Sequence, residues 1–215
     1  MLLRADWSKI TVGPAKQIAD FIVVRSVYHR AADAWTAKVS HALDEVKDQD
    51  VGFTALRHII NEAKSQDGVR KVFLFTDGGR ADFKCAQFVH SLFSIQEKTD
   101  VEINHIVMAP YHGHGSADAA KAQASRKLKN WFMNEHEIYH SLDTIRDVFN
   151  DVNNHRVLDL APLWARPLCG KLRGVADYYQ FYFDVELGHI YANFKATVEG
   201  VVDADKTWDT AFTGR

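Results

Sequence analysis

Three segments near the N-terminus have the alternation and composition of β-strands. Residues 20–29 show the pattern most clearly, because β-branched and aromatic side chains dominate there. Residues 2–7 and 35–43 have shorter or less regular versions of the same pattern. The sequence therefore predicts that the chain begins with three strands.

The middle of the chain alternates between helical and strand patterns. Phe53, Leu56 and Ile60 recur at helical spacing, which predicts an amphipathic helix over residues 51–64. Residues 71–76 are a continuous apolar run, typical of a strand that is covered on both faces. A helix over residues 81–96 and a strand over residues 101–108 are predicted to follow.

Two more helices and a hairpin are predicted in the last hundred residues. The first helix starts near residue 116, and the second covers residues 141–150 and packs against the end of the first. The apolar face of the first helix comprises Ala117, Ala120, Ala124, Leu128 and Trp131. Residues 179–183 and 189–194 are aromatic segments joined by a glycine-containing turn, which indicates a β-hairpin.

This order of elements predicts an α/β fold. Three strands are followed by alternating helices and strands, and right-handed crossovers make the late strands parallel. We expect a mixed sheet flanked by helices over residues 1–155. Residues 156–215 are expected to form a C-terminal extension that carries the β-hairpin.

Composition excludes several classes of protein. Of 215 residues, 47% are hydrophobic and 25% are charged, which excludes a disordered or low-complexity chain. Cys85 and Cys169 belong to no CxxC pair, so zinc-ribbon and thioredoxin-like sites are unsupported and a reducing compartment is expected. No apolar run reaches the roughly 20 residues that span a membrane. We expect an intracellular protein, or a chain that lacks its native leader.

The net charge of −2 excludes a protein that binds nucleic acid through its overall charge. A nucleic-acid surface would have to be a local patch. Four cations are grouped in the helix predicted after residue 116: Lys121, Arg126, Lys127 and Lys129. They can follow a phosphate backbone, and the alternative interpretation is an ordinary solvated helix face.

Three aspartates are candidate metal ligands. Asp6 ends the predicted first strand, Asp77 ends the apolar strand and Asp118 opens a helix. If the two strands are neighbours, the three carboxylates can converge at one sheet edge, where oxygen ligands favour Mg²⁺ or Mn²⁺. Two such ions about 4 Å apart can activate an attacking oxygen and stabilise a leaving oxygen in phosphoryl transfer.

Each aspartate also has an interpretation without a metal. Asp77 precedes a glycine, which is a common turn pair, and Asp6 could be a solvated residue near a frayed terminus. Asp118 could be a first-turn acid that the helix dipole stabilises. Asp20, which heads the second predicted strand, is the substitute candidate for Asp6.

Three motifs surround the aspartates. Residues 75–84 read FTDGGRADFK, residues 112–118 read HGHGSAD and residues 2–7 read LLRADW. These motifs resemble segments of the DDE/D transposases and integrases. FTDGGRADFK resembles their SDG…QFK segment after the fourth strand, and HGHGSAD resembles their HGKGxxDG segment at the last catalytic helix. LLRADW resembles the first-strand aspartate followed by an aromatic residue. These enzymes belong to the RNase H-like superfamily, and the resemblance covers about residues 2–131.

The resemblance implies an RNase H-like fold in which Asp6, Asp77 and Asp118 bind two Mg²⁺ or Mn²⁺ ions. Such a site cuts DNA phosphodiester bonds with water as the nucleophile, or joins them with a DNA 3′-hydroxyl. DNA is then the expected partner, a homo-oligomer is expected, and a nuclear location follows from the same resemblance.

Other residues near the motifs are assigned supporting roles. His112 and His114 would line the site, where an imidazole can donate to a phosphate or move protons. As an HxH pair without a third ligand at recognised spacing, they are weak evidence for zinc. The residues expected to contact nucleic acid are Lys84, Lys121, Arg126 and Lys129.

The chain departs from the family pattern at three positions. His114 replaces a lysine, and Ala119 and Ala120 replace glycines. These departures leave open a catalytically inert domesticated domain that binds nucleic acid or protein. Among enzymes, the alternative is an RNase H-type nuclease that acts on an RNA strand. Because the chain starts at the first catalytic strand, we expect either an excised catalytic domain or a domesticated relative.

Overall fold

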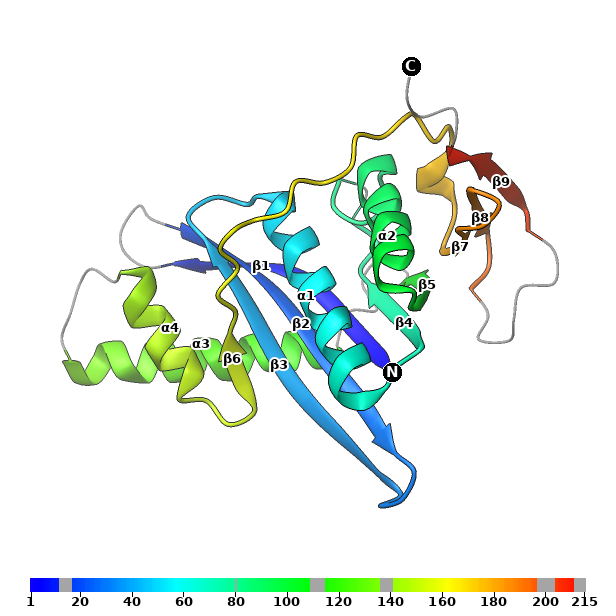
Figure 1. The fold of residues 1–215 in the computed structure, drawn as a ribbon. Coiled ribbons are helices and arrows are strands. Elements are labelled where there is room, and N and C mark those ends of the chain that lie inside the picture. The colour runs from blue at the N-terminus through cyan, green and yellow to red at the C-terminus, as the bar shows by residue number, and fades with distance from the viewer. Residues whose placement is uncertain (12–16, 80, 109–114, 136–140, 197–203, 211–215) are drawn as a thin grey trace. The chain divides into compact units, whose positions relative to one another are not determined.

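The computed structural model describes residues 1–11, 17–79, 81–108, 115–135, 141–196 and 204–210, and its fold is mixed α/β (Figure 1). The chain forms two compact units. The α3 unit comprises Leu3–Ala55 and His114–Trp164, and the α2 unit comprises Met1–Leu2, Leu56–Gly113 and Ala165–Arg215. Helix α1 (Gln49–Asp67) contributes residues to both units.

The described residues of the α3 unit form four strands in the order β6-β3-β2-β1. Their bounds are β1 (Leu2–Thr11), β2 (Gln17–His29), β3 (Ala34–Asp44) and β6 (His155–Val157). Strands β2 and β3 form a long antiparallel hairpin, whereas β6 runs parallel to β3. The three predicted strands are confirmed, and all three are longer than predicted. Strand β6 was not predicted, because three residues are too few to show a periodic pattern.

Two helices complete the α3 unit, α3 (Ser116–Glu135) and α4 (Leu142–Asn150). The predicted apolar face of α3 is confirmed, since Ala117, Ala120, Ala124 and Leu128 are buried and Trp131 is half-buried. Ala124 and Leu128 belong to a hydrophobic cluster that also contains three buried side chains of α4, namely Ile145, Val148 and Phe149. The predicted packing of the second helix on the first is therefore also confirmed. The Ser141 hydroxyl begins α4 by accepting the backbone N–H of Thr144 at 3.2 Å.

In the part of the α2 unit that the structure describes, five strands lie in the order β4-β5-β7-β8-β9. Their bounds are β4 (Lys71–Thr76), β5 (Glu102–Val107), β7 (Gln180–Asp184), β8 (His189–Asn193) and β9 (Lys206–Asp209). Strands β4 and β5 are parallel as predicted, and β7 adds antiparallel to β5. The predicted hairpin is confirmed as β7–β8, and it extends the sheet. Gly188, with a φ of 68°, forms its turn.

Helix α2 (Ala86–Thr99) packs beside β5 and β7 in the α2 unit (Figure 1). It starts five residues later than the predicted helix over residues 81–96. The physical reason is a tight turn, in which the carbonyl oxygen of Gly79 accepts the backbone N–H groups of Asp82, Phe83 and Lys84 at 2.9–3.2 Å. A short 3₁₀ helix, Val175–Asp177, precedes β7.

Strand β4 is less covered than predicted. Val72, Leu74 and Thr76 are buried, but the alternate side chains Phe73 and Phe75 are only half-buried. The expectation of burial on both faces is therefore wrong for one face. Among the described helices, none is long and apolar enough to cross a membrane.

Candidate functional site

Asp6 lies within β1 and not at its end, which corrects the prediction from the sequence. The strand continues to Thr11 because the alternation persists, with Ser8 and Ile10 buried and Lys9 exposed. Asp6 is half-buried, and its Oδ1 accepts the backbone N–H of Trp7 at 2.7 Å.

The two faces of β1 contact different elements of the α3 unit. On one face, the Trp7 ring packs on Phe21 with ring centroids 4.9 Å apart and lies against Gly52 of α1. On the other face, Ile10 belongs to the cluster that contains Ala124 and Leu128 of α3. Even-numbered side chains of β1, including that of Asp6, therefore point to the α3 side of the sheet.

Arg4 shows which part of α3 lies near this face. A Cβ atom at Gly115 would be only 2.9 Å from Arg4 Nη1, so the Arg4 side chain lies directly against the residue that precedes α3. Asp6 follows Arg4 by two positions on the same face, and Asp118 lies in the first turn of α3. The α3 unit thus places Asp6 and Asp118 on the same side of its sheet, toward the start of the same helix.

Asp118 is exposed, and its Oδ2 accepts the backbone N–H of Gly115 at 3.1 Å. A carboxylate in the first turn is also stabilised by the helix dipole. The first-turn interpretation is therefore satisfied, and it leaves the carboxylate accessible from solvent.

Asp77 immediately follows β4 in the α2 unit and is exposed. Its Oδ1 accepts the backbone N–H of Gly79 at 3.0 Å, which is the turn expected of an aspartate before glycines. A Cβ at Gly79 would lie 3.0 Å from Asp77 Oδ1 and 3.5 Å from Asp82 Oδ2. Two carboxylates, those of Asp77 and Asp82, therefore flank Gly79. The sequence motif did not single out Asp82.

Lys84, predicted to contact nucleic acid, is only 5% exposed. Its Nζ lies 3.7 Å from the centroid of the Tyr179 ring, which is a cation–π contact inside the α2 unit. Burial leaves this ammonium group little surface for a phosphate, so Lys84 is not part of the DNA-binding face proposed below.

The cations of α3 lie off its buried stripe. Lys121, Arg126 and Lys129 are exposed, and Ser125 is exposed between the two lysines. Lys127 differs from them, since its Nζ pairs with Asp151 Oδ2 at 2.5 Å. Asp118, Lys121, Ser125 and Lys129 follow one another at three- and four-residue steps, which places them along one side of the helix.

Two predicted site residues, His112 and His114, lie outside the described residues. Within the described part of the chain, no three or more His, Cys, Asp or Glu side chains are grouped so that they could hold a metal ion. Asp6 and Asp118 belong to the α3 unit and Asp77 to the α2 unit. A metal site formed by the three aspartates stays a prediction.

Asp20, the substitute candidate, is unsuited to bind a metal from solvent. It is 1% exposed, and its Oδ2 contacts Nδ1 of the fully buried His41 at 2.9 Å. His41 Nε2 contacts His155 Nδ1 at 2.9 Å, and His155 Nε2 contacts Gln123 Oε1 at 3.2 Å. This chain of four side chains, the Asp20–Gln123 relay, joins β2 and β3 to β6 and α3.

The relay has a defined proton arrangement. Burial, together with the neighbouring His41, lowers the pKa of His155 to about 4, so His155 is neutral at pH 7. With Gln123 Oε1 as the acceptor, the single proton of His155 is on Nε2, and its Nδ1 accepts from His41. His41 then donates from Nε2 to His155, and its Nδ1 faces the Asp20 carboxylate. Nothing in the sequence spacing indicated this relay.

Another buried histidine, His105, lies next to the end of β4, which Asp77 follows. Nε2 of His105, on β5, contacts the Thr76 hydroxyl at 2.9 Å, and that hydroxyl donates to the Asp77 carbonyl oxygen at 3.3 Å. The His105 ring stacks on Phe181 with centroids 5.6 Å apart. Burial lowers the pKa of His105 to about 3, so the ring is neutral. The hydrogen bonds of the Thr76 hydroxyl to His105 and to Asp77 anchor the backbone at the end of β4.

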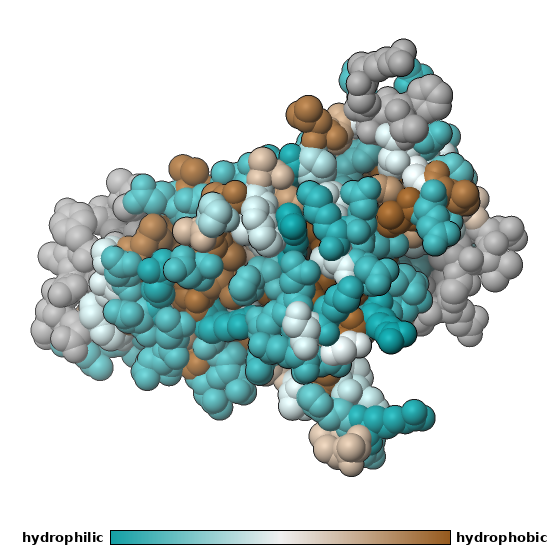
Figure 2. Space-filling view, in the orientation of Figure 1, coloured by the Kyte–Doolittle hydropathy of each residue, from teal (hydrophilic) through white to brown (hydrophobic). Residues whose placement is uncertain are grey.

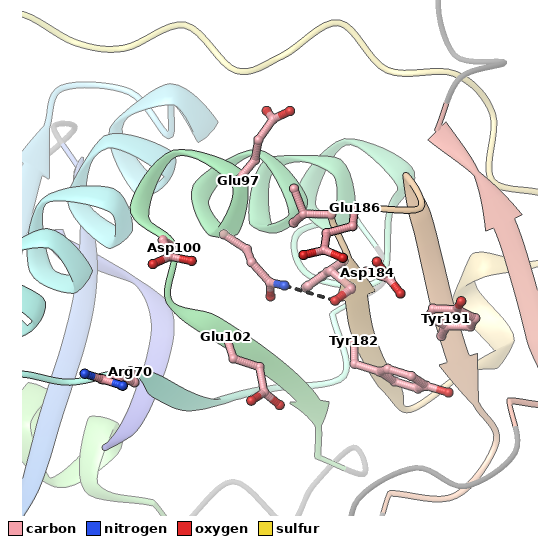
Figure 3. A pocket seen from close by; sticks show the side chains of 11 residues that line it. Arg70, Glu97, Asp100, Glu102, Tyr182, Asp184, Glu186 and Tyr191 are labelled. Carbon is pink, nitrogen blue, oxygen red and sulfur yellow. Dashed lines mark hydrogen bonds between the residues drawn. The ribbon is translucent and has the colours of Figure 1, made fainter.

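The α2 unit also contains an open pocket of about 600 Å³ (Figure 3). Five carboxylates line it, namely Glu97, Asp100, Glu102, Asp184 and Glu186. The dashed line in Figure 3 is the hydrogen bond from Gln96 Nε2 to the Phe183 carbonyl oxygen, 2.9 Å long. Arg70 also lines the pocket, and Lys71, outside the lining, pairs with Glu102 at 2.5 Å, but carboxylates dominate the lining. Their negative potential disfavours phosphate, so this pocket is not a DNA site.

Comparison with known proteins assigns a family but no activity. The search of curated proteins gives no match. Among solved structures, the Thermus thermophilus RuvC structure matches 81% of this chain and 86% of that chain, with 8% identity and a TM-score of 0.24, and a likeness this weak supports no inference about function. Neither that structure nor the matching family model carries a transposase or integrase description, so this finer assignment stays a prediction. The family model described as "Domain of unknown function (DUF8701)" matches residues 26–157, more than half of the chain, and the chain therefore belongs to that family.

Proposed function

We propose that this protein is a Mg²⁺- or Mn²⁺-dependent enzyme that cuts or joins phosphodiester bonds of DNA, with Asp6, Asp77 and Asp118 as the metal ligands. The observation that carries the proposal is the layout of the α3 unit. Asp6 and Asp118 lie on the same side of its sheet toward the start of α3, and exposed cations continue along that helix.

The chemistry of the three carboxylates suits a hard divalent cation. Each aspartate uses one oxygen to accept a backbone N–H, at distances of 2.7, 3.0 and 3.1 Å for Asp6, Asp77 and Asp118. These hydrogen bonds fix the orientation of the carboxylates before any metal arrives. Asp77 and Asp118 are exposed, so a hydrated cation can reach them. An all-oxygen ligand set favours Mg²⁺ or Mn²⁺ over zinc.

The side chains of α3 would orient the substrate. When bound, the metal ions would activate the attacking oxygen and neutralise charge on the phosphate and the leaving oxygen. Lys121 and Lys129 lie on the side of α3 that carries Asp118, so a DNA backbone that reaches Asp118 would pass along them. Helix α3 would thus supply both a metal ligand, Asp118, and the cations that hold the DNA backbone.

The metal requirement tests this proposal directly. Purified protein incubated with supercoiled plasmid or a labelled duplex should nick or resect DNA with Mg²⁺ or Mn²⁺ and should do nothing in EDTA. Calorimetric titration with Mn²⁺ provides a second readout that does not need activity. Equal cleavage in EDTA would exclude the metal mechanism. DNA binding without either Mn²⁺ binding or cleavage would instead support the inert scaffold.

The DNA-binding face is tested by Lys121→Ala/Lys129→Ala. Removing two phosphate contacts should weaken DNA binding at low salt and reduce the salt slope by about one to two counterions, because each contact releases about one condensed cation. Fluorescence anisotropy at several salt concentrations measures both. Mn²⁺ affinity should stay near that of the parent.

Lys127→Ala is the matched control, since Lys127 lies on the same helix but already pairs with Asp151. Lys127→Ala should change the salt slope of DNA binding less than Lys121→Ala or Lys129→Ala does on its own. If the double variant keeps the affinity and salt slope of the parent, the DNA-binding face is not on this side of α3.

A further inference from the structure

The end of the β2–β3 hairpin extends beyond the packed part of the α3 unit (Figure 1). Burial ends at Arg25 on β2 and starts again at Val39 on β3, and every residue from 28 to 38 is exposed. Figure 2 shows the protruding end as mostly hydrophilic in colour, with a small tan area. We call residues 26–38 the hairpin arm.

The hairpin arm carries two exposed aromatic side chains that face each other across the strands. Tyr28 is directly opposite Trp35, and their ring centroids are 5.4 Å apart at an interplanar angle of 46°. Tyr28 is 44% exposed and Trp35 57% exposed. The Tyr28 hydroxyl donates to the Asp33 carboxylate, which holds the ring in place. The hairpin arm thus presents an aromatic surface of two rings in a fixed orientation toward solvent.

The aromatic pair lies on the α3 side of the sheet. Ile22, Val24 and Val39 pack against Ala117 and Ala120 in the first part of α3. Tyr28 shares the even-numbered face with Ile22 and Val24.

The direction of α3 along the sheet follows from a second cluster. Ile18 packs with residues further along the helix, Ala124 and Leu128. The start of α3 therefore points toward the hairpin arm. Tyr28 lies four residues past Val24, roughly 13 Å beyond the first buried turn of α3.

The charge of the hairpin favours a polyanion. Within the hairpin arm the only acid is Asp33, whereas Arg30 and Lys38 are basic. Asp33 is already engaged by Tyr28, and Arg30 and Lys38 are exposed. The chain as a whole has a net charge of −2, so the hairpin is locally positive on a slightly acidic protein.

We propose that Tyr28 and Trp35 stack on unpaired bases of a DNA strand whose backbone follows α3 past Asp118, so that the substrate class is DNA with a single-stranded segment beside the cleavage position. The inference rests on the proposed function for the path along α3. Aromatic stacking combined with cations is how proteins hold single strands, because every base has a flat face and every nucleotide a phosphate. A blunt duplex offers no base face to these rings, whereas an overhang or junction does.

The test compares binding to three labelled DNAs in EDTA, where no cleavage can occur: a blunt duplex, the same duplex with a ten-nucleotide overhang, and the overhang strand alone. The parent protein should bind the overhang duplex about tenfold or more tightly than the blunt duplex, as expected for one or two stacked bases. Tyr28→Ala/Trp35→Ala should lose this preference while binding the blunt duplex like the parent.

Two control variants separate stacking from folding. Trp35→Phe keeps an aromatic face and should keep the preference. Leu168→Ala removes a side chain that is 96% exposed in the α2 unit and should change nothing. Circular dichroism and melting temperature should be near those of the parent, since both aromatic side chains are largely exposed.

The outcomes separate this inference from the proposed function. A protein that shows the overhang preference but cuts no DNA would keep the stacking inference and overturn the enzyme. A protein that cuts but binds blunt and overhang duplexes equally would overturn the stacking inference alone. If Tyr28→Ala/Trp35→Ala keeps the preference for the overhang duplex, the stacking inference is also overturned. Sedimentation that shows Tyr28 and Trp35 holding two copies of the chain together would overturn it as well.

Discussion

Asp77→Asn is expected to abolish metal-dependent DNA cleavage, a loss on the order of a thousandfold or more. Asparagine removes the negative charge that would hold a divalent cation. Its Oδ1 can still accept the backbone N–H of Gly79, as the aspartate does at 3.0 Å. The turn after β4 should therefore keep its shape while the site loses a ligand. Cleavage rates under saturating Mn²⁺ measure the loss.

The same substitution should leave the melting temperature unchanged or raise it. Asp77 and Asp82 both border Gly79, so the protein without metal holds two like charges close together, and removing one relieves repulsion. This separates a ligand from a structural residue, because a structural residue would lower the melting temperature when it is replaced.

Asp82→Asn is the matched control for Asp77→Asn. It removes the same charge from the other side of the same glycine, and it should keep most of the cleavage activity. A folded Asp77→Asn protein with full turnover would remove Asp77 from the site. Loss of cleavage in Asp82→Asn but not in Asp77→Asn would transfer the ligand role to Asp82.

Local periodicity predicted most of the fold because the buried faces repeat. The stripe from Ala117 to Leu128 repeats every three or four residues, and each of its small side chains packs on the sheet. The apolar run over residues 71–76 coincides with β4. The predicted start of the second helix was wrong because backbone hydrogen bonds to the Gly79 carbonyl form a turn there. Helix α2 therefore begins at Ala86 and not at residue 81.

The candidate site was only partly predictable, because its parts depend on contacts between distant residues. The predicted strand over residues 2–7 placed Asp6 at its end, whereas β1 continues to Thr11 and buries the polar residue Ser8. His41 and His155 are 114 residues apart in sequence and form no motif, yet their rings share a hydrogen bond. The exposure of Tyr28 and Trp35 was hidden for a similar reason, because aromatic residues in a strand usually indicate burial.

The free energy of unfolding is expected to fall as the pH decreases from 6.5 to about 4, and the Asp20–Gln123 relay should be a main cause. His155 has an unfolded pKa of 6.5, and burial beside His41 lowers its folded pKa to about 4. In this pH window the unfolded chain binds a proton that the folded chain excludes, so acid favours unfolding. Below about pH 4 both states are protonated and the loss levels off. At roughly 1.4 kcal/mol per unit of pKa, the fall in pKa from 6.5 to about 4 lets His155 account for at most about 3.5 kcal/mol.

His155→Gln isolates this contribution. Glutamine cannot titrate, so the variant should be less stable than the parent at pH 7 but should lose less stability between pH 7 and pH 4.5. Urea denaturation at pH 7, 6, 5 and 4.5 measures both slopes, and carboxylates that titrate near pH 4 contribute equally to each protein and cancel in the difference.

His58→Gln is the matched control for His155→Gln, because His58 has a side chain that is 47% exposed and lies 3.9 Å from Glu62 on the surface of α1. It should keep the pH dependence of the parent. His105, with a pKa of about 3, titrates in the same direction and remains in both variants. If His155→Gln and the parent lose stability in parallel from pH 7 to pH 4.5, then His155 does not exclude a proton in the folded state, and the proton arrangement assigned to the relay is wrong.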